Sequence, residues 1–362
     1  MRTGFSAILT TVFRRAVLMS AAAALLLCGV PPRSASACTT FMLERGGERV
    51  VGKSYDWYMG QGLVIINKSG VAKRALLAKS GDRPAQWTSR HASVTFNQYG
   101  REFPAGGMND AGLVVEIMWL ESSEYERADQ RPTLNELQWI QYQLDSHATV
   151  AEVIAAAPGL RVSPVYARVH YLACDKTGAC AAFEWVDGKR VITPGARALT
   201  NHTYAQSFAW ASKQKQPPAG AGSLERFTRA ARQAAAPPAG DLTTAAFGVL
   251  DGVRWAESQW NIVYDPVHLR VSFRTRVNRA IKTLDLGKLA ASCAQPVTLV
   301  DIDADPGGDV GDRLRPYDQA TNRNLIERSV RRIRGQLPAG AIDMMVAYPS
   351  ALACQAPKDQ AR

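Results

Sequence analysis

The grouping of strand-like and helix-like stretches constrains the fold of this 362-residue chain more than any other feature. β-Branched and apolar runs separated by glycine turns follow one another over 38–69 and are interpreted as consecutive antiparallel strands. The runs SVTFNQYG and GLVVEIMWL suggest a further strand pair around a GMNDAG turn. Strand-like runs return over 167–194 and over 261–286. Because helices are expected between these blocks and not after each strand, the order does not fit alternating βαβ units. It predicts an α+β layered fold.

Helix starts are indicated by two capping-box spacings. Thr133 stands three residues before Glu136, and Thr149 three residues before Glu152, each ahead of apolar residues at helical spacing. Two helices are therefore expected to begin at these threonines. Further helices are expected over 224–236, 242–255 and 322–334.

Two segments rich in Pro, Gly and Ala, 213–222 and 235–240, are interpreted as loops and not as domain linkers. The strands before and after them are expected to belong to one sheet system. A single domain is therefore predicted over 38–362.

The first 37 residues differ from the rest. Arginines precede an apolar run over 16–30, and two prolines and the small residues Ala35-Ser36-Ala37 follow it. A membrane span needs about 20 consecutive apolar residues, so this run is too short to be an anchor. The pattern predicts a cleaved secretory signal peptide over 1–37, a periplasmic or secreted protein, and no integral membrane protein.

The distribution of Lys and Arg bears on whether the protein binds nucleic acid. The formal net charge is +11, but Lys and Arg are scattered apart from Arg331, Arg332 and Arg334 on the expected late helix. A solvated helix face explains these three residues, so no nucleic-acid partner is expected.

The cysteines that follow the leader are odd in number. Cys174 and Cys180 bracket a turn sequence and favour a hairpin disulfide, which leaves Cys293 and Cys354 to tie down the C-terminal tail. Four cysteines allow three pairings, so this one is a hypothesis. Cys38 is left over, as a reactive thiol, a structural cysteine or a lipidation site.

Removal of the leader would make Cys38 the first residue and place its own α-amine beside its thiol. The amine has an ordinary pKa of about 7.7 to 8.0 and the thiol one of about 8.5, so the amine can accept the thiol proton at neutral pH. None of the five histidines lies in a recognisable catalytic or zinc motif. Both features are consistent with an N-terminal nucleophile.

Four segments, CTTFMLERGGERVVGKSYDW, GMNDAGLVVEIMWL, ALTNHT and SLERFTR, occur in this order and span most of the chain after the leader. In them the sequence resembles the choloylglycine hydrolase and penicillin V acylase family, in its exported Gram-negative branch. The resemblance implies a four-layer αββα N-terminal-nucleophile fold and hydrolysis of a linear carbon–nitrogen amide in a small molecule. It implies no metal or other cofactor, and relatives that are often tetramers.

The resemblance also implies roles for single residues. Cys38 matches the nucleophile, and Asp56 matches the aspartate that orients it. Asn201 matches an oxyanion-hole donor, and Arg226 the arginine beside the nucleophile. The second oxyanion donor is implied to be the backbone N–H of Trp119.

Substrate preference is read from three positions. Trp119 and Trp57 are expected to build an apolar wall for a phenoxyacetyl or fatty acyl group. Lys53, also expected at the substrate site, replaces the family's usual arginine and lacks its bidentate fork. These residues favour a penicillin V acylase, with N-acyl homoserine lactones as further substrates. Bile-salt hydrolysis is the enzymatic alternative, and a non-enzymatic lipidated periplasmic protein is the alternative from another class.

Overall fold

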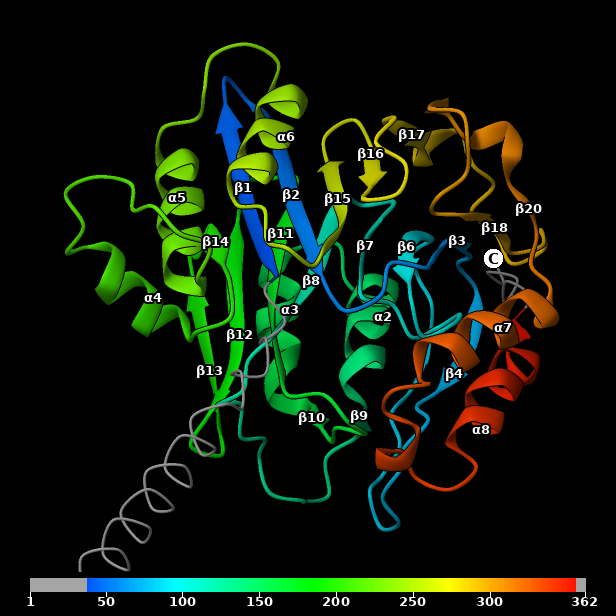
Figure 1. The fold of residues 1–362 in the computed structure, drawn as a ribbon. Coiled ribbons are helices and arrows are strands. Elements are labelled where there is room, and N and C mark those ends of the chain that lie inside the picture. Colours follow the sequence, from blue (N-terminus) through cyan, green and yellow to red (C-terminus); the bar gives the residue numbers. More distant parts are fainter. Residues whose placement is uncertain (1–37, 356–362) are drawn as a thin grey trace, which may run out of the picture. The chain divides into compact units, whose positions relative to one another are not determined.

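Two large sheets face each other in the computed structural model, which describes residues 38–355 (Figure 1). The expected signal peptide, 1–37, lies outside the described residues. Sheet A has the strand order β14 (Ala198–Leu199), β1 (Thr39–Arg45), β2 (Glu48–Asp56), β15 (Ser258–Asp265), β16 (Arg270–Thr275), β17 (Lys282–Asp285) and β19 (Gly308–Asp309). Sheet B has the order β13 (Lys189–Pro194), β12 (Cys180–Val186), β11 (Val169–Asp175), β8 (Leu113–Trp119), β7 (Gly106–Asn109), β6 (Ser93–Asn97), β3 (Leu63–Asn67), β18 (Thr298–Asp301) and β20 (Arg315–Pro316).

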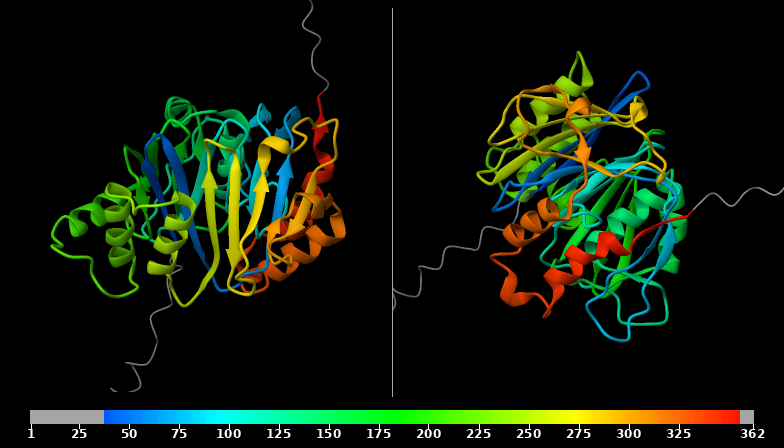
Figure 2. Two further views of the ribbon diagram at one scale, coloured as in Figure 1. Left: turned by 90° about the horizontal axis from the view of Figure 1, so that it is seen from above. Right: turned by 90° about the vertical axis from the view of Figure 1, so that its right-hand side faces the viewer.

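Helices cover the outer face of each sheet (Figure 2). Against sheet A pack α5 (Ser223–Ala235) and α6 (Leu242–Gly252), and α4 (Tyr204–Ala211) packs on α5. Against sheet B pack α2 (Glu136–Ser146) and α3 (Val150–Ala156). The predicted four-layer αββα arrangement is therefore confirmed.

Alternation along β1 explains why the two sheets stack. Phe41 and Leu43 point outward and pack with residues of α5 and α6, whereas Met42 between them points inward into the core shared with sheet B. Successive side chains of a strand face opposite sides, so a run of apolar residues in a strand is buried on both faces. Phe41 to Leu43 form such a run in β1, and sheet A is accordingly enclosed there between helices and the second sheet.

The remaining elements lie at the C-terminal end and at the rims. α7 (Gln319–Ser329) and α8 (Ala341–Ala347) pack on each other. A small sheet joins β21 (Ala353–Cys354), β4 (Val71–Arg74) and β5 (Gln86–Thr88), and β9 (Thr133–Leu134) pairs with β10 (Arg161–Val162).

The structure corrects three local expectations. Thr133 lies in β9, and Asn135 caps α2 instead, with its side chain accepting from Leu137 and Gln138. β3 joins sheet B and does not pair with β2. The expected turn GMNDAG contributes to β7, which lies between β6 and β8 and separates them. The cap predicted at Thr149 is confirmed.

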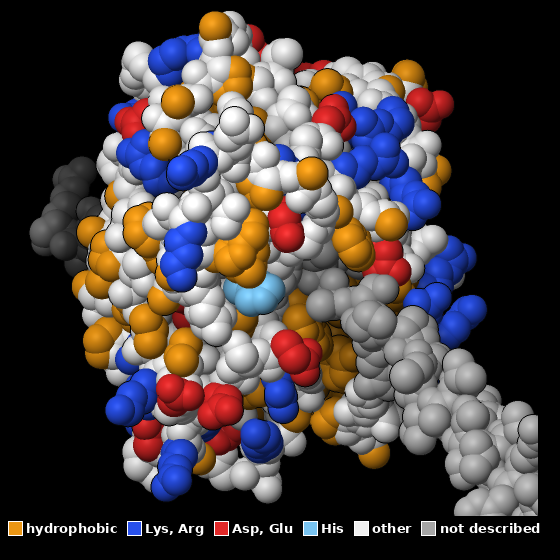
Figure 3. All heavy atoms as spheres, turned by 60° about the vertical axis from the view of Figure 1, so that its left-hand side comes forward, with side chains coloured by type: hydrophobic (Ala, Val, Ile, Leu, Met, Phe, Trp, Pro, Cys, Tyr) orange, Lys and Arg blue, Asp and Glu red, His pale blue; other side chains and the backbone are white. Residues whose placement is uncertain are grey.

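The helix expected over 322–334 is wrong at its end, because α7 stops at Ser329. The helices α4 and α8 were not expected. Among the helices of residues 38–355, none combines the length and the apolar character that crossing a membrane requires. On the face drawn in Figure 3, Lys and Arg side chains lie among acidic and hydrophobic ones.

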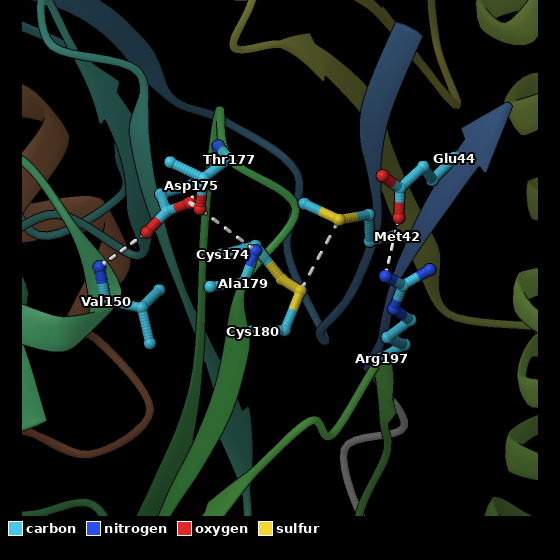
Figure 4. The surroundings of a disulfide bond; sticks show 9 residues. All are labelled: Met42, Glu44, Val150, Cys174, Asp175, Thr177, Ala179, Cys180 and Arg197. Atoms are coloured by element: carbon cyan, nitrogen blue, oxygen red, sulfur yellow. Dashed lines mark hydrogen bonds and ion pairs between the residues drawn. A yellow bond between two sulfur atoms is a disulfide. The ribbon is translucent and has the colours of Figure 1, made fainter. Parts of the chain in front are cut away.

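Both predicted disulfides are present. Cys174 pairs with Cys180 across the β11–β12 turn, and Cys293 pairs with Cys354. Figure 4 shows Cys180 pointing from sheet B towards Met42 of sheet A, with 3.6 Å between their sulfur atoms. Cys38 is the free cysteine among the described residues.

Candidate active site

Cys38 immediately precedes β1 and belongs to the large buried cluster shared by the two sheets. Its residue is only 4% exposed, and its Sγ lies 3.9 Å from the carbonyl oxygen of Asp56. β1 is hydrogen-bonded to β2 on one side and to β14 on the other. The strand that follows Cys38 is therefore held by neighbours on both of its edges.

Arg226 connects the predicted site residues. It lies in the first turns of α5 and is almost completely buried. Its Nη1 donates to the Cys38 carbonyl oxygen at 2.8 Å and to Thr39 Oγ1 at 2.6 Å, and its Nη2 donates to Asn201 Oδ1 at 2.9 Å. The planar guanidinium thus fixes the backbone of Cys38 and the side chain of Asn201 relative to each other.

Asp56 ends β2 and is fully buried. Its Oδ1 accepts from Ser54 Oγ at 2.6 Å, and its Oδ2 lies 3.9 Å from Arg226 Nη1. Among the described residues, this Oδ2 accepts no hydrogen bond. Burial raises the pKa of the Asp56 carboxyl, and Arg226 opposes the rise. The aspartate therefore has one oxygen available to a donor beside Cys38.

Asn201 follows β14 and lies next to Trp119. Its Nδ2 donates to the Trp119 carbonyl oxygen at 2.9 Å, and its backbone N–H donates to Ser223 Oγ at 2.9 Å. An amide nitrogen carries two hydrogens, so one N–H of Asn201 remains after the bond to Trp119.

Burial is the main influence on the thiol. It raises the pKa of Cys38, Asp56 acts in the same direction, and the nearby charges of Lys53 and Arg226 lower it. The balance is a raised pKa, so at neutral pH the thiol is protonated and needs a base to become a nucleophile.

Lys53 is fully buried between the sheets. Its Nζ lies 3.5 Å from Glu116 Oε2 and donates to the carbonyl oxygen of Ile117. Lys53 is not among the described residues that line the cavity. Burial raises the pKa of Glu116 to about 7, while Lys53 and a hydrogen bond from Tyr264 lower it.

An apolar cavity of about 1040 Å³, counting its open mouth, extends from Cys38. Trp57 and Trp119 form one wall, with 5.9 Å between their ring centroids, and Tyr166 lies 6.2 Å from Trp119. The far wall comes from α8 and the segment before it, namely Val330, Ile333, Leu337, Pro338, Ala341, Met344 and Met345.

Two polar side chains of the cavity wall, Asn135 and Glu136, already have partners. Asn135 caps α2 and donates to Leu76. The Glu136 carboxylate accepts the backbone N–H groups of residues 165–167, which themselves line the cavity. These polar groups therefore shape the wall and are occupied before any ligand enters.

Sequence reasoning missed the far wall and Glu136. The run AIDMMVA has apolar residues at helical spacing after Gly340, and this signal could have revealed α8. No local signal indicates that it lines the same cavity as Cys38, because the two are about 300 positions apart in the sequence. A surface cluster that could bind a metal ion was also missed. It consists of Glu48, Asp265 and His268, whose side-chain oxygen and nitrogen atoms lie within 4.8 Å of one another, away from the cavity.

Comparison with known proteins reveals one local sequence match. Over 129 residues the chain is 32% identical to a penicillin V acylase of Pectobacterium atrosepticum, and the match covers 31% of this chain and 34% of that protein. The chain thus spans about a third of the length of this relative. No family model matches the chain.

Solved structures extend the likeness to the fold. A penicillin V acylase from Agrobacterium tumefaciens aligns with a TM-score of 0.70 and 24% identity over 78% of this chain and 98% of that one. A variant of the conjugated bile acid hydrolase from Clostridium perfringens aligns with a TM-score of 0.61 and 16% identity over 75% and 98%. These alignments confirm the predicted N-terminal-nucleophile hydrolase fold.

Proposed function

We propose that this chain is a member of the choloylglycine hydrolase and penicillin V acylase family and that it cleaves the carbon–nitrogen bond of linear amides with Cys38 as its nucleophile. The observation that carries the proposal is the position of Cys38. It is a free, buried thiol at the end of an apolar cavity, and Arg226 fixes its backbone.

The proposal includes removal of residues 1–37 on export to the periplasm or beyond the cell. The Cys38 thiol is protonated at neutral pH, and among the described residues no histidine hydrogen-bonds to it. A new α-amine on Cys38 would supply the missing base. The unpartnered Oδ2 of Asp56 supports this step, because a carboxylate there can accept a hydrogen bond from the amine.

Asn201 and Trp119 are the proposed oxyanion donors. Asn201 has one N–H left, as described above. The Ile117 N–H donates to the carbonyl oxygen of Ala105, just before β7. Backbone N–H groups two residues apart point to the same edge of a strand. The Trp119 N–H therefore points to the β7 edge of β8, at a position beyond the start of β7. A preorganised donor at this point is worth about 3 kcal/mol to the transition state.

The reaction then has two halves. The α-amine takes the thiol proton, the thiolate attacks the carbonyl carbon, and the oxyanion forms beside Asn201 and Trp119. The C–N bond breaks as the ammonium of Cys38 returns its proton to the leaving nitrogen, which gives a thioester and a free amine. Water then attacks the thioester, releases the carboxylic acid and restores the thiol.

The acyl group is proposed to be apolar, either aromatic as in penicillin V or aliphatic as in N-acyl homoserine lactones. Trp57, Trp119 and the far wall offer apolar contacts. A hydroxylated steroid would need several polar partners. Asn135 and Glu136 are already engaged, and among the described residues of the wall Trp57 Nε1 is a buried donor without a partner. This arrangement favours plain acyl amides over bile salts.

The test combines processing with activity. Intact mass of the exported protein is expected to show a chain that starts at an unmodified Cys38. This protein should hydrolyse penicillin V and decanoyl homoserine lactone, and Cys38→Ser should lose both activities. A lipidated Cys38 without amidase activity would support the lipidated binding-protein alternative. Preference for glycocholate would replace the acyl-amide substrate by a bile salt.

A further inference from the structure

We infer that His170 and Glu184 position the oxyanion-hole residue Asn201, although neither touches the cavity. The inference rests on the proposed function, in which Asn201 donates to the oxyanion. It concerns residues 200–204, which connect β14 to α4 and contain Asn201.

His170 is fully buried on β11, and both of its ring nitrogens have oxygen partners. Nδ1 lies 2.9 Å from Glu184 Oε1, and Nε2 lies 2.6 Å from the carbonyl oxygen of Thr200. A carbonyl oxygen can only accept, so Nε2 carries a hydrogen and donates to Thr200. Nδ1 is therefore the ring nitrogen that contacts Glu184.

The Thr200 carbonyl belongs to the peptide group that enters Asn201. That group is planar, so holding its oxygen fixes the orientation of the Asn201 nitrogen as well. Ser223 Oγ accepts this N–H at 2.9 Å. The backbone on the N-terminal side of Asn201 is therefore held from sheet B and from α5.

Glu184 holds the other end of the segment. Its two carboxylate oxygens accept the Tyr204 backbone N–H at 3.0 and 3.1 Å, at the start of α4. A negative charge at a helix N-terminus is favourable, and Glu184 is 2% exposed. His170 and Glu184 thus secure both sides of the Asn201 loop.

β11 also neighbours the other donor, Trp119 of β8. Val169, next to His170, pairs with Trp119 in the β11–β8 register. The Asn201 side chain contacts the Trp119 carbonyl oxygen. β11 therefore supports both oxyanion donors, through Val169 for Trp119 and through His170 for Asn201.

Two substitutions of His170 separate its contacts. The Asn amide nitrogen takes the place of Nδ1, so His170→Asn keeps the contact with Glu184 and loses the one with Thr200. The Gln amide nitrogen reaches the place of Nε2, so His170→Gln keeps the donor to Thr200. Asp175→Asn is the matched control: this buried carboxylate lies at the opposite end of β11 and accepts backbone N–H groups of Val150 and Thr177 (Figure 4).

The experiment measures three quantities for the processed enzyme. For His170→Asn we expect kcat on decanoyl homoserine lactone to fall about tenfold with KM within about twofold, a part of the 10²- to 10³-fold that a whole donor contributes. Alkylation of Cys38 by iodoacetamide should be unchanged. Hydrogen exchange over 200–204 should be faster. His170→Gln and Asp175→Asn should retain the wild-type kcat.

Unchanged exchange over 200–204 in His170→Asn would overturn the inference, as would equal losses of kcat in His170→Asn and His170→Gln. A parallel loss of alkylation rate would also overturn it, because the effect would then lie on the nucleophile. A wild-type enzyme without amidase activity would instead refute the proposed function, and the exchange data would still decide whether His170 holds the loop.

Discussion

Arg226 and Asn201 are joined by a hydrogen bond of 2.9 Å from the guanidinium Nη2 to the side-chain Oδ1. This bond orients the amide so that its nitrogen faces Trp119. The same guanidinium holds the Cys38 carbonyl through Nη1. Arg226 therefore contacts the nucleophile's backbone and the side chain of the oxyanion donor at the same time.

Arg226→Lys tests this dependence. Lysine keeps the charge but cannot bind Cys38, Thr39 and Asn201 in one plane. We expect kcat to fall about 100-fold, as for loss of an oxyanion donor. Arg229→Lys, one turn further along α5, is the control and should retain activity. Equal kcat values for the two variants would contradict the role of Arg226.

The buried Lys53–Glu116 pair predicts a pH effect on stability. Burial raises the pKa of Glu116 from 4.5 to about 7, so in this window the folded state binds the proton more tightly than the unfolded state. The stability of the wild type relative to Glu116→Gln should therefore fall between pH 4.5 and pH 7, by up to about 3 kcal/mol, and level off above. Urea unfolding at several pH values measures this difference, and a constant difference would refute the prediction.

The far wall of the cavity predicts a length limit for the acyl chain. Ala341 lines the cavity at the start of α8. A phenylalanine there should exclude about two methylenes of a long acyl chain from the cavity, and each buried methylene contributes about 0.8 kcal/mol. The variant should therefore lower kcat/KM for a dodecanoyl amide about tenfold relative to a hexanoyl amide. Ala347→Phe, on the exposed side of the same helix, should leave the ratio unchanged. An unchanged ratio in Ala341→Phe would place the acyl chain elsewhere.

The Cys293–Cys354 disulfide encloses α7 and α8 in a loop of 61 residues. Replacing both cysteines by serine should lower stability by about 4 kcal/mol, if the disulfide acts on unfolded-chain entropy, and raise KM for long acyl chains more than for short ones. The Cys174–Cys180 pair closes a hairpin away from the cavity, so its double serine variant should lose stability without this dependence on chain length. The same KM pattern in both variants would speak against a link between the C-terminal tail and the cavity.

Much of the fold could be predicted because its signals are local. The hairpin β1–β2 turns at Gly46 and Gly47, both at positive φ, and the cap at Thr149 depends on residues three positions apart. The Cys174–Cys180 disulfide was hypothesised from the turn sequence that the two cysteines bracket, and Cys293–Cys354 was the pair that remained. The cap at Thr133 was wrong because Asn135, two residues later, offers a competing side chain and Thr133 pairs in a strand instead.

The site could be predicted only in part. The structure brings Cys38, Asp56, Asn201 and Arg226 together, and their catalytic roles stay predictions. Lys53 was expected near substrate, but alternation along β2 turns it towards Glu116 of the facing sheet. The surroundings of Lys53 depend on how the two sheets stack, and a local stretch of sequence carries no information about that stacking.

The loop from Asn201 to Ser223 is closed at its base, because Thr200 and Asn201 both bond to Ser223 and Glu184 holds Tyr204. Everything between Tyr204 and Ser223, including the Pro- and Gly-rich stretch after α4, leaves from and returns to fixed points. Doubling the length of such a loop costs only about 0.6 kcal/mol. Residues 215–217 are consequently a place where chain length can drift, or an affinity tag be inserted, without moving the oxyanion hole. Ala221 and Gly222 are not, because Ala221 accepts from Arg226 Nε at 3.0 Å and Gly222 caps α5.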